Sequence, residues 1–168
     1  HDARTLYFAF APRAARKPDY YSPERRSFHI YAVGADGEGL RQLTGGPGDD
    51  FDPCPLPDGG IAFMSSRRGG FCRCNNPWEP LPAYTLHRME ADGSNVRTLS
   101  FHETNEWHPS VLSDGRIVYT RWDYVDRSAA HFHGLWASRP DGTQTTELFG
   151  SYTQRINACY QPRAVPGS

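Results

Sequence analysis

The chain has 168 residues, a formal net charge of −1 and 38% hydrophobic residues, which is enough for one domain with a buried core. The near-neutral charge argues against a dedicated nucleic-acid-binding protein, because such proteins carry an excess of lysine and arginine. No apolar run reaches the roughly 18 residues of a transmembrane helix, so no membrane span is expected. Because the first residue is His1 and not methionine, we interpret the chain as a processed protein or a piece of a longer one.

In chain order, the first predicted strand is the aromatic-rich stretch 4–10, which alternates along its length. The elements after it repeat, with a proline that begins a short strand at Pro53, Pro109 and Pro162. Tight Asp-Gly turns recur at 36–37, 58–59, 92–93, 114–115 and 141–142. Glycine adopts the positive φ of such hairpin turns without steric cost. Each period therefore holds two tight turns and four short strands, the signature of a propeller blade.

The repeat predicts an all-β fold, a single β-propeller segment of about three four-stranded antiparallel blades over residues 1–168. The expected units are strands b to d of blade i over 4–43, blade ii over 52–99, blade iii over 108–148 and the first strand of blade iv over 158–163. Propellers close with about four to eight blades, so this ring is incomplete by itself. We expect other domains or chains to complete it, because both outer blades would otherwise keep unpaired edges.

The long connections all fall at one end of the predicted blades, which we call the loop end. They are residues 11–26, 44–51, 66–83, 100–107, 122–132 and 149–157. The opposite end, the short-turn end, has only tight turns. Variable loops on a rigid scaffold are where binding normally takes place, so we expect a protein partner at the loop end.

Acidic residues gather near the starts of the first strands, close to the expected propeller axis. They are Asp49, Asp50, Asp52, Glu103 and Glu106. A ring of carboxylates there could hold Ca²⁺, which prefers oxygen ligands. The alternative is that these are solvated loop acids and turn-capping aspartates, since Asp is common in turns.

Four cysteines, Cys54, Cys72, Cys74 and Cys159, suit an exported protein with disulfides, although free buried thiols are the alternative. Cys54–Cys72 or Cys54–Cys74 is the favoured bond, because both partners belong to one blade. A zinc site is a further possibility, with Cys72, Cys74, His131 and His133 as ligands at the loop end. Apart from calcium or zinc, no cofactor is expected in this segment.

Catalytic motifs are absent from the sequence. Trp107-His108 and Trp122-Asp123 place a histidine and an acid near strand ends, but no Gly-x-Ser-x-Gly, His-Glu-x-x-His or phosphate loop accompanies them. Aromatics repeated at one blade position more often pack blade on blade. Cys-x-x-Cys-His, the attachment motif of c-type haem, is also absent.

The pattern of FDPCPLPDGGIAFMSSRRGG followed by YTLHRMEADGSNVRTLS resembles the TolB-type β-propeller repeat, and the resemblance covers nearly the whole chain. A narrower resemblance, to the propeller of hydrazine synthase alpha subunit-like proteins, is carried by HRMEADGSNVRTLSFHETNEWHPSVLSDGRIVYTRWDYVDR with LWASRPDGT and QPRAVPGS. It implies an exported bacterial protein, periplasmic or extracellular, with a larger parent polypeptide. The haem-binding motifs of hydrazine synthase have no counterpart here, so its catalytic role does not carry over.

Together these features favour a non-catalytic propeller segment that scaffolds and binds through its loop end. Two alternatives stay open at the level of sequence. One is a propeller domain of a haem-dependent, hydrazine synthase-like redox enzyme, and the other is a structural subunit of an extracellular assembly.

Overall fold

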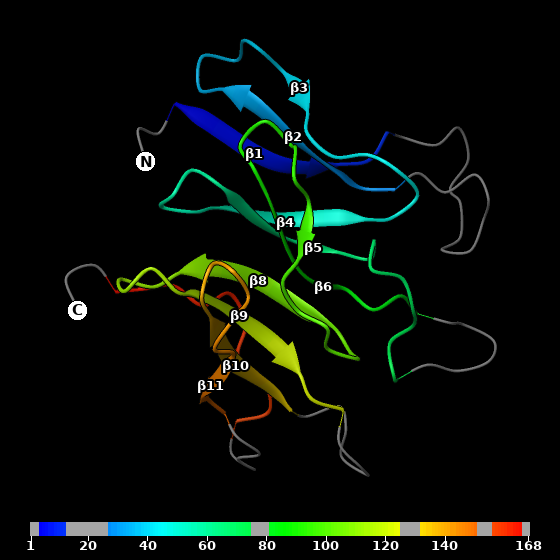
Figure 1. Ribbon diagram of the computed structural model, residues 1–168, viewed down its shortest axis with the longest axis vertical. Coiled ribbons are helices and arrows are strands. Elements are labelled where there is room, and N and C mark those ends of the chain that lie inside the picture. The colour runs from blue at the N-terminus through cyan, green and yellow to red at the C-terminus, as the bar shows by residue number, and fades with distance from the viewer. Residues whose placement is uncertain (1–3, 13–26, 75–80, 125–131, 151–155, 166–168) are drawn as a thin grey trace.

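The computed structural model describes residues 4–12, 27–74, 81–124, 132–150 and 156–165. These residues form antiparallel sheets and no helix, so none of them lies in a helix able to cross a membrane. Figure 1 shows three sheets arranged one after another along the long axis. The predicted all-β fold and the incomplete set of about three blades are thereby confirmed.

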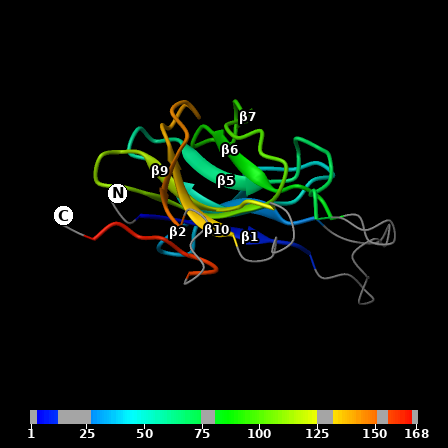
Figure 2. The same ribbon diagram turned by 90° about the horizontal axis from the view of Figure 1, so that it is seen from below.

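Each blade is one sheet, and its strands pair in chain order. Blade i consists of β1 (Thr5–Phe10), β2 (His29–Gly34) and β3 (Arg41–Gln42). Blade ii consists of β4 (Asp50–Pro55), β5 (Ile61–Ser65), β6 (Thr85–Met89) and β7 (Arg97–Thr98). Blade iii consists of β8 (Glu106–Val111), β9 (Ile117–Trp122), β10 (His133–Ser138) and β11 (Thr146–Phe149). Seen from below in Figure 2, the sheets stack face on face.

The Asp-Gly turns form because aspartate and glycine act together. In each turn the aspartate Oδ1 accepts a hydrogen bond from the backbone N–H two residues later, at Asp36, Asp58, Asp92, Asp114 and Asp141. The glycine that follows each aspartate has a φ between 84° and 90°. The side chain thus closes the turn and the glycine supplies a conformation that other residues rarely adopt.

A proline interrupts the first strand of blades ii and iii in the same way. The register of β4 against β5 shifts between Phe51 and Cys54, and that of β8 against β9 shifts between Trp107 and Ser110. Asp52 and His108, the residues before the prolines, have φ values of 52° and 54°. Because proline has no N–H to give to the ladder, the strand bulges at this point.

The apolar core lies between neighbouring blades. One cluster joins blades i and ii and centres on Ile30, Ile61 and Phe63. A second cluster joins blades ii and iii and includes Leu86 and Tyr119. Because each face of blade ii is covered, all residues of β5 and β6 are buried.

A backbone hydrogen bond recurs at every blade junction. The N–H of Asp50 donates to the carbonyl of Phe28, that of Glu106 to Tyr84, and that of Cys159 to His133. The third bond shows that residues 156–165 begin on blade iii as β8 begins on blade ii. The expected strand at 158–163 is reduced to a single bridge from Ala158 to His133, because no second strand lies beside it among the described residues.

Candidate binding site between blades ii and iii

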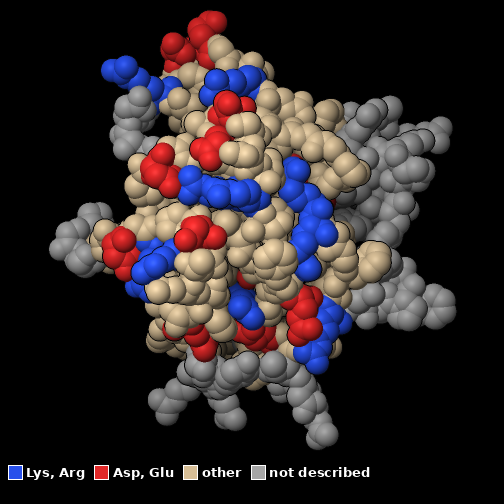
Figure 3. Space-filling model, viewed as in Figure 1, with Lys and Arg blue, Asp and Glu red and all other residues tan. Residues whose placement is uncertain are grey.

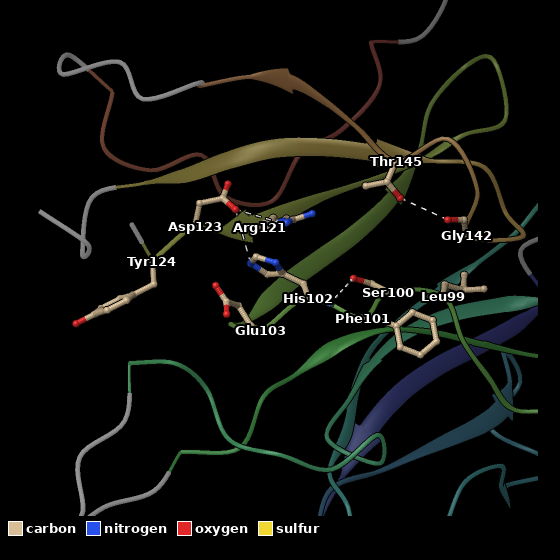
Figure 4. A pocket seen from close by; sticks show the side chains of 10 residues that line it. All are labelled: Leu99, Ser100, Phe101, His102, Glu103, Arg121, Asp123, Tyr124, Gly142 and Thr145. Carbon is tan, nitrogen blue, oxygen red and sulfur yellow. Dashed lines mark hydrogen bonds and ion pairs between the residues drawn. The ribbon is translucent and has the colours of Figure 1, made fainter. Parts of the chain in front are cut away.

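A pocket of about 610 Å³ opens between blades ii and iii. Its walls are the connection from β7 to β8, the end of β9 and the turn between β10 and β11, as Figure 4 shows. The lining residues are Leu99, Ser100, Phe101, His102, Glu103, Arg121, Asp123, Tyr124, Gly142 and Thr145. The volume is in the range of small-molecule and peptide side-chain sites.

His102 is fixed at the edge of this pocket. Its Nε2 lies 2.8 Å from the carbonyl oxygen of Trp122 and 2.7 Å from Oγ1 of Thr104. A carbonyl only accepts, so Nε2 carries the proton and donates to Trp122. Burial lowers the pKa of His102 to about 4, so the imidazole is neutral at neutral pH.

Asp123 and Arg121 form the charged wall that faces His102 in Figure 4. Arg121 Nε lies 3.2 Å from Asp123 Oδ1, and the same carboxylate oxygen is 3.7 Å from His102 Nε2. The guanidinium also lies over the ring of Trp136, at 4.1 Å from its centroid. Burial raises the pKa of Asp123, while Arg121 opposes that rise. This wall is therefore held by its own ion pair and by a cation–π contact.

Ser100, His102 and Asp123 are the residue types of a hydrolytic triad, but they are not arranged as one. Ser100 Oγ donates to Glu106 Oε1 at 2.7 Å and accepts the backbone N–H of His102 at 3.3 Å. The imidazole makes its contacts with Trp122 and Thr104 instead of with the serine hydroxyl. A nucleophile needs a hydrogen bond to its base, and this geometry does not supply one.

Glu106 lies behind Ser100 and is completely buried. Its two carboxyl oxygens accept from Ser100 Oγ and, at 2.8 Å, from the N–H of Leu86. Burial raises the pKa of Glu106 to about 7, and these two hydrogen bonds oppose the rise. The side chain therefore joins β8 to β6 across the blade junction.

The rim of the pocket is more open than its walls. Phe101 is 76% exposed, and Glu103 extends outward to an ion pair with Arg73 at 2.8 Å. Tyr124 continues the rim at the end of β9. An exposed aromatic ring beside an acidic group, above a fixed polar wall, is an arrangement suited to binding a partner side chain.

The sequence analysis placed loop 100–107 at the binding end but did not single out Phe101, His102 or Arg121. A comparison of the two blade junctions would have found the first two. Thr44 and Ser100 each lie two residues after the last strand of a blade and six residues before the first strand of the next blade, and each hydroxyl makes a hydrogen bond, Thr44 with the N–H of Ile30 and Ser100 with Glu106. After Thr44 come Gly45 and Gly46, whereas after Ser100 come Phe101 and His102.

The five acids proposed for calcium are spread over the blade junctions. Asp50 is buried with Arg67 Nη2 at 2.6 Å, Asp49 accepts from Phe28 N–H at 3.0 Å, and Asp52 accepts from His108 N–H at 2.9 Å. Glu103 and Glu106 make the contacts given above. Among the described residues no three His, Cys, Asp or Glu side chains gather closely enough for a metal ion. The calcium site therefore stays a prediction, and the described residues do not bring these five acids together as a set of ligands.

The zinc ligands are also apart where they can be placed. Cys72 and Cys74 follow β5, with Arg73 N–H bonded to the carbonyl of Glu103, whereas His133 begins β10 and stacks on Trp122 at 5.3 Å. His131 lies outside the described residues. The zinc site therefore also stays a prediction.

The expected disulfide is not formed, since Cys54, Cys72, Cys74 and Cys159 are all free thiols. Cys54 pairs in register with Ala62 at the start of β5, while Cys72 lies beyond the other end of that strand. A disulfide needs Cα atoms within about 7 Å, which residues at opposite ends of a strand do not reach. Burial raises the pKa of Cys54 to about 11, so this thiol is unreactive.

Aromatic rings gather on the outer face of blade iii. Trp107 stacks on Trp122 at 6.4 Å and lies 5.7 Å from His133. Tyr160, from the segment after β11, packs edge-on against Trp107 at 6.2 Å. The corresponding contact in blade ii joins Phe51 and Tyr84 at 5.0 Å and lies beneath blade iii. These rings belong to blade iii and to the segment after it, so the use of aromatics to pack blade on blade stays a prediction for this cluster.

Charged side chains of both signs are interspersed on the face shown in Figure 3, without a field of one sign. This distribution agrees with the formal net charge of −1.

No known family and no curated protein matches the sequence. The structure is similar to TolB from Agrobacterium tumefaciens, with 22% identity and a TM-score of 0.59 over 85% of this chain and 45% of that one. It is similar to hydrazine synthase from Kuenenia stuttgartiensis, with 14% identity and a TM-score of 0.67 over 89% of this chain and 24% of that one. TolB from Acinetobacter baumannii gives 14% identity and a TM-score of 0.54, over 89% and 30%.

The chain thus has a TolB-type propeller fold, which confirms the predicted resemblance at the level of fold. It spans less than half the length of each of these structures.

Proposed function

We propose that this chain is a non-catalytic β-propeller segment, part of a larger exported bacterial protein that is periplasmic or extracellular. Its role is to scaffold that protein and to bind a protein partner at the loop end. The centre of the binding surface is the part of the pocket that the connection from β7 to β8 and the end of β9 form between blades ii and iii.

The observation that supports this function is the division of the pocket into fixed walls and an open rim. The polar wall groups already have partners within the chain, as in His102 with Trp122 and Arg121 with Asp123. The rim instead offers the exposed ring of Phe101 and the exposed ion pair between Glu103 and Arg73. A fixed base with an exposed aromatic anchor is typical of a protein-binding surface.

The arrangement of Ser100, His102 and Asp123 supports the non-catalytic part of the proposal. The Ser100 hydroxyl donates its hydrogen bond to Glu106 and not to the His102 imidazole. His102 is neutral and its Nε2 proton is committed to a carbonyl, so it is poorly placed to shuttle protons.

Photo-crosslinking in the parent protein tests the proposal. A photoreactive phenylalanine analogue placed at Phe101 or Tyr124 is expected to give a defined protein adduct in the exporting cell. The matched controls are Asn95 and Arg116 at the short-turn end, which should give none. Equal adducts at both ends would contradict binding through the loop end.

A kinetic test addresses the non-catalytic part of the proposal. Turnover by the parent protein that is lost in His102→Asn, while circular dichroism and the unfolding midpoint stay unchanged, would refute it. Turnover that is insensitive to His102→Asn and Ser100→Ala would agree with a role for this segment in binding.

A further inference from the structure

We propose that the pocket between blades ii and iii receives a carboxylate of the partner protein, which binds to the guanidinium of Arg121 beside the exposed ring of Phe101. This inference rests on the proposed function, because it names the chemical group that the partner presents at the same site. It depends on the balance of hydrogen-bond donors and acceptors in the wall of the pocket.

Arg121 is held on one side only. Its side chain is 20% exposed, and its guanidinium carbon lies 4.1 Å from the centre of the Trp136 ring. Its Nε lies 3.2 Å from Asp123 Oδ1, and Asp123 is its one ion-pair partner among the described residues. In Figure 4 the rest of the guanidinium lies on the side away from Asp123, towards Thr145. The planar group is therefore fixed, while its two terminal nitrogens have no carboxylate from the described part of the chain.

Hydrogen-bond donors are in excess around Asp123. The Nε of Arg121 and the Nε1 of Trp136 are both buried, and neither makes a hydrogen bond of normal geometry. Both lie beside the same carboxylate, because burial raises the pKa of Asp123 while Arg121 and the Trp136 indole oppose that rise. A guanidinium and an indole N–H can only donate. One carboxylate thus serves two donor groups, so this wall is short of acceptors.

A third buried donor lies behind the wall. Tyr119 is on the same face of β9 as Arg121, two residues earlier, and is completely buried. Its hydroxyl lies near Thr145, which lines the pocket, but makes no hydrogen bond of normal geometry. Burial and the nearby carboxyl of Glu106 raise the pKa of this hydroxyl, so it keeps its proton. Buried polar groups are nearly always hydrogen-bonded, so the shortage of acceptors indicates that an acceptor binds in the pocket.

A carboxylate is the acceptor that fits this wall best. Its two oxygens match two parallel N–H groups on one edge of a guanidinium, and such pairs are among the strongest hydrogen bonds in proteins. The acids of the pocket are already engaged, since Asp123 pairs with Arg121 and Glu103 with Arg73. Among the described residues, Glu147 of β11 acts on Asp123 but makes no ion pair with Arg121.

The rim indicates what lies next to the carboxylate on the partner. The ring of Phe101 is 76% exposed and lines the same pocket, after the nearly buried Leu99. An apolar group of the partner that covers this ring would remove apolar surface from water, which favours binding. The partner is therefore expected to present an acidic group beside an apolar side chain.

Saturation-transfer difference NMR on the parent protein tests this with hydrocinnamate, which carries a carboxylate and a phenyl ring. Its matched neutral probe is hydrocinnamamide, which has the same ring. The acid should bind saturably, and the amide about tenfold more weakly, because it has no charge and only one oxygen for the guanidinium. This comparison uses the native protein and depends on no variant.

Two variants locate the binding group. Arg121→Lys should weaken the binding of hydrocinnamate about tenfold, because lysine keeps the charge but not the planar fork. Asp123→Asn should strengthen it, because the guanidinium then has no competing carboxylate. Arg116→Lys is the matched control, since Arg116 also pairs with an aspartate but lies at the short-turn end, and it should change nothing. Circular dichroism and the unfolding midpoint show that each variant is folded.

Equal binding of the acid and the amide would overturn the proposal. So would hydrocinnamate binding that is the same in Arg121→Lys as in the native protein, or that is no stronger in folded Asp123→Asn, because the guanidinium would then not be the binding group.

Two acetylated peptides identify the source of the carboxylate. Aspartyl-phenylalanine with an amidated end presents only a side-chain carboxylate, whereas phenylalanine with a free end presents only a terminal one. Binding of either peptide that is lost in Arg121→Lys supports the proposal and names the source. Binding of neither would overturn it.

Crosslinking from Tyr124 separates this inference from the proposed function. A defined protein adduct that is at least about tenfold weaker in Arg121→Lys supports both. An adduct that persists undiminished in Arg121→Lys would overturn the carboxylate and leave the binding surface in place. If no adduct forms while hydrocinnamate still binds through Arg121, the protein partner is refuted and the carboxylate site stands.

Discussion

Gly142 of blade iii lies against the backbone carbonyl of Leu99 in blade ii, so closely that no side chain fits between them. The same contact joins Gly93 to Leu43 one junction earlier. These glycines therefore do two things, since they close a tight turn and allow one blade to rest on the next.

Gly142→Ala should destabilise the chain more than Gly115→Ala. Both glycines have a φ of 84°, so the added methyl group costs the backbone the same at each. Only at position 142 would it meet another blade, and forced overpacking costs about 1–3 kcal/mol. Urea unfolding of both variants would give the difference, and equal losses would show that the Leu99 contact can adjust freely.

Glu106→Gln should make stability less dependent on pH. Burial raises the folded-state pKa of Glu106 to about 7 from the usual 4.5 of a glutamate, so the stability that its protonated form contributes is full below about 4.5 and is lost as pH rises through about 7. The shift corresponds to roughly 3 kcal/mol. The unfolding free energy of Glu106→Gln minus that of the native chain should rise between pH 5 and pH 8. A flat difference would mean that Glu106 is ionised in the folded state at pH 5.

His102 should titrate in the opposite sense. Its folded-state pKa is lowered by burial to about 4, so the stability it contributes is present above about 6.5 and is lost as pH falls towards 4. NMR of the imidazole should show a neutral ring with the proton on Nε2 down to about pH 4. The imidazole signal that disappears in His102→Gln is the signal of His102. A pKa near 6.5 for this imidazole would contradict its buried position.

Arg67→Met should be strongly destabilising, because it leaves the carboxylate of Asp50 buried without its guanidinium partner. The expected loss is roughly 3 kcal/mol. Arg116→Met is the matched control, since Arg116 also pairs with an aspartate, Asp114, but at the surface, where such pairs contribute at most about 1 kcal/mol. Adding Asp50→Asn to Arg67→Met should recover part of the loss, and strict additivity would show that the pair is not coupled.

Much of the fold could be predicted because its signals are local. Asp58 and Gly59 specify their turn through two local features. The Asp58 carboxylate accepts a hydrogen bond from the N–H of Gly60, two residues later, and Gly59 has a positive φ. Both features follow from two adjacent residues in the sequence. The proline of each first strand marks a strand position in the same way. Repetition of these signals is what made the number of blades predictable.

The site was harder to predict because its contacts are not local. Asp50 meets Arg67 across 17 residues, and its position in the sequence does not indicate this buried ion pair. Cys54 and Cys72 share a blade, yet the ladder places them at different ends of β5. The spacing along the chain predicts the blade to which a residue belongs. The end of the strand at which it lies, and the face of the sheet on which its side chain lies, depend on how the strands pair.

The junction bonds from Asp50 to Phe28, from Glu106 to Tyr84 and from Cys159 to His133 are few, so each blade is tied mainly to its immediate neighbours. Unfolding should therefore spread inward from the outer sheets. Amide protons of β5 and β6, which are enclosed on both sides, should exchange with solvent most slowly, and those of β1 should exchange early.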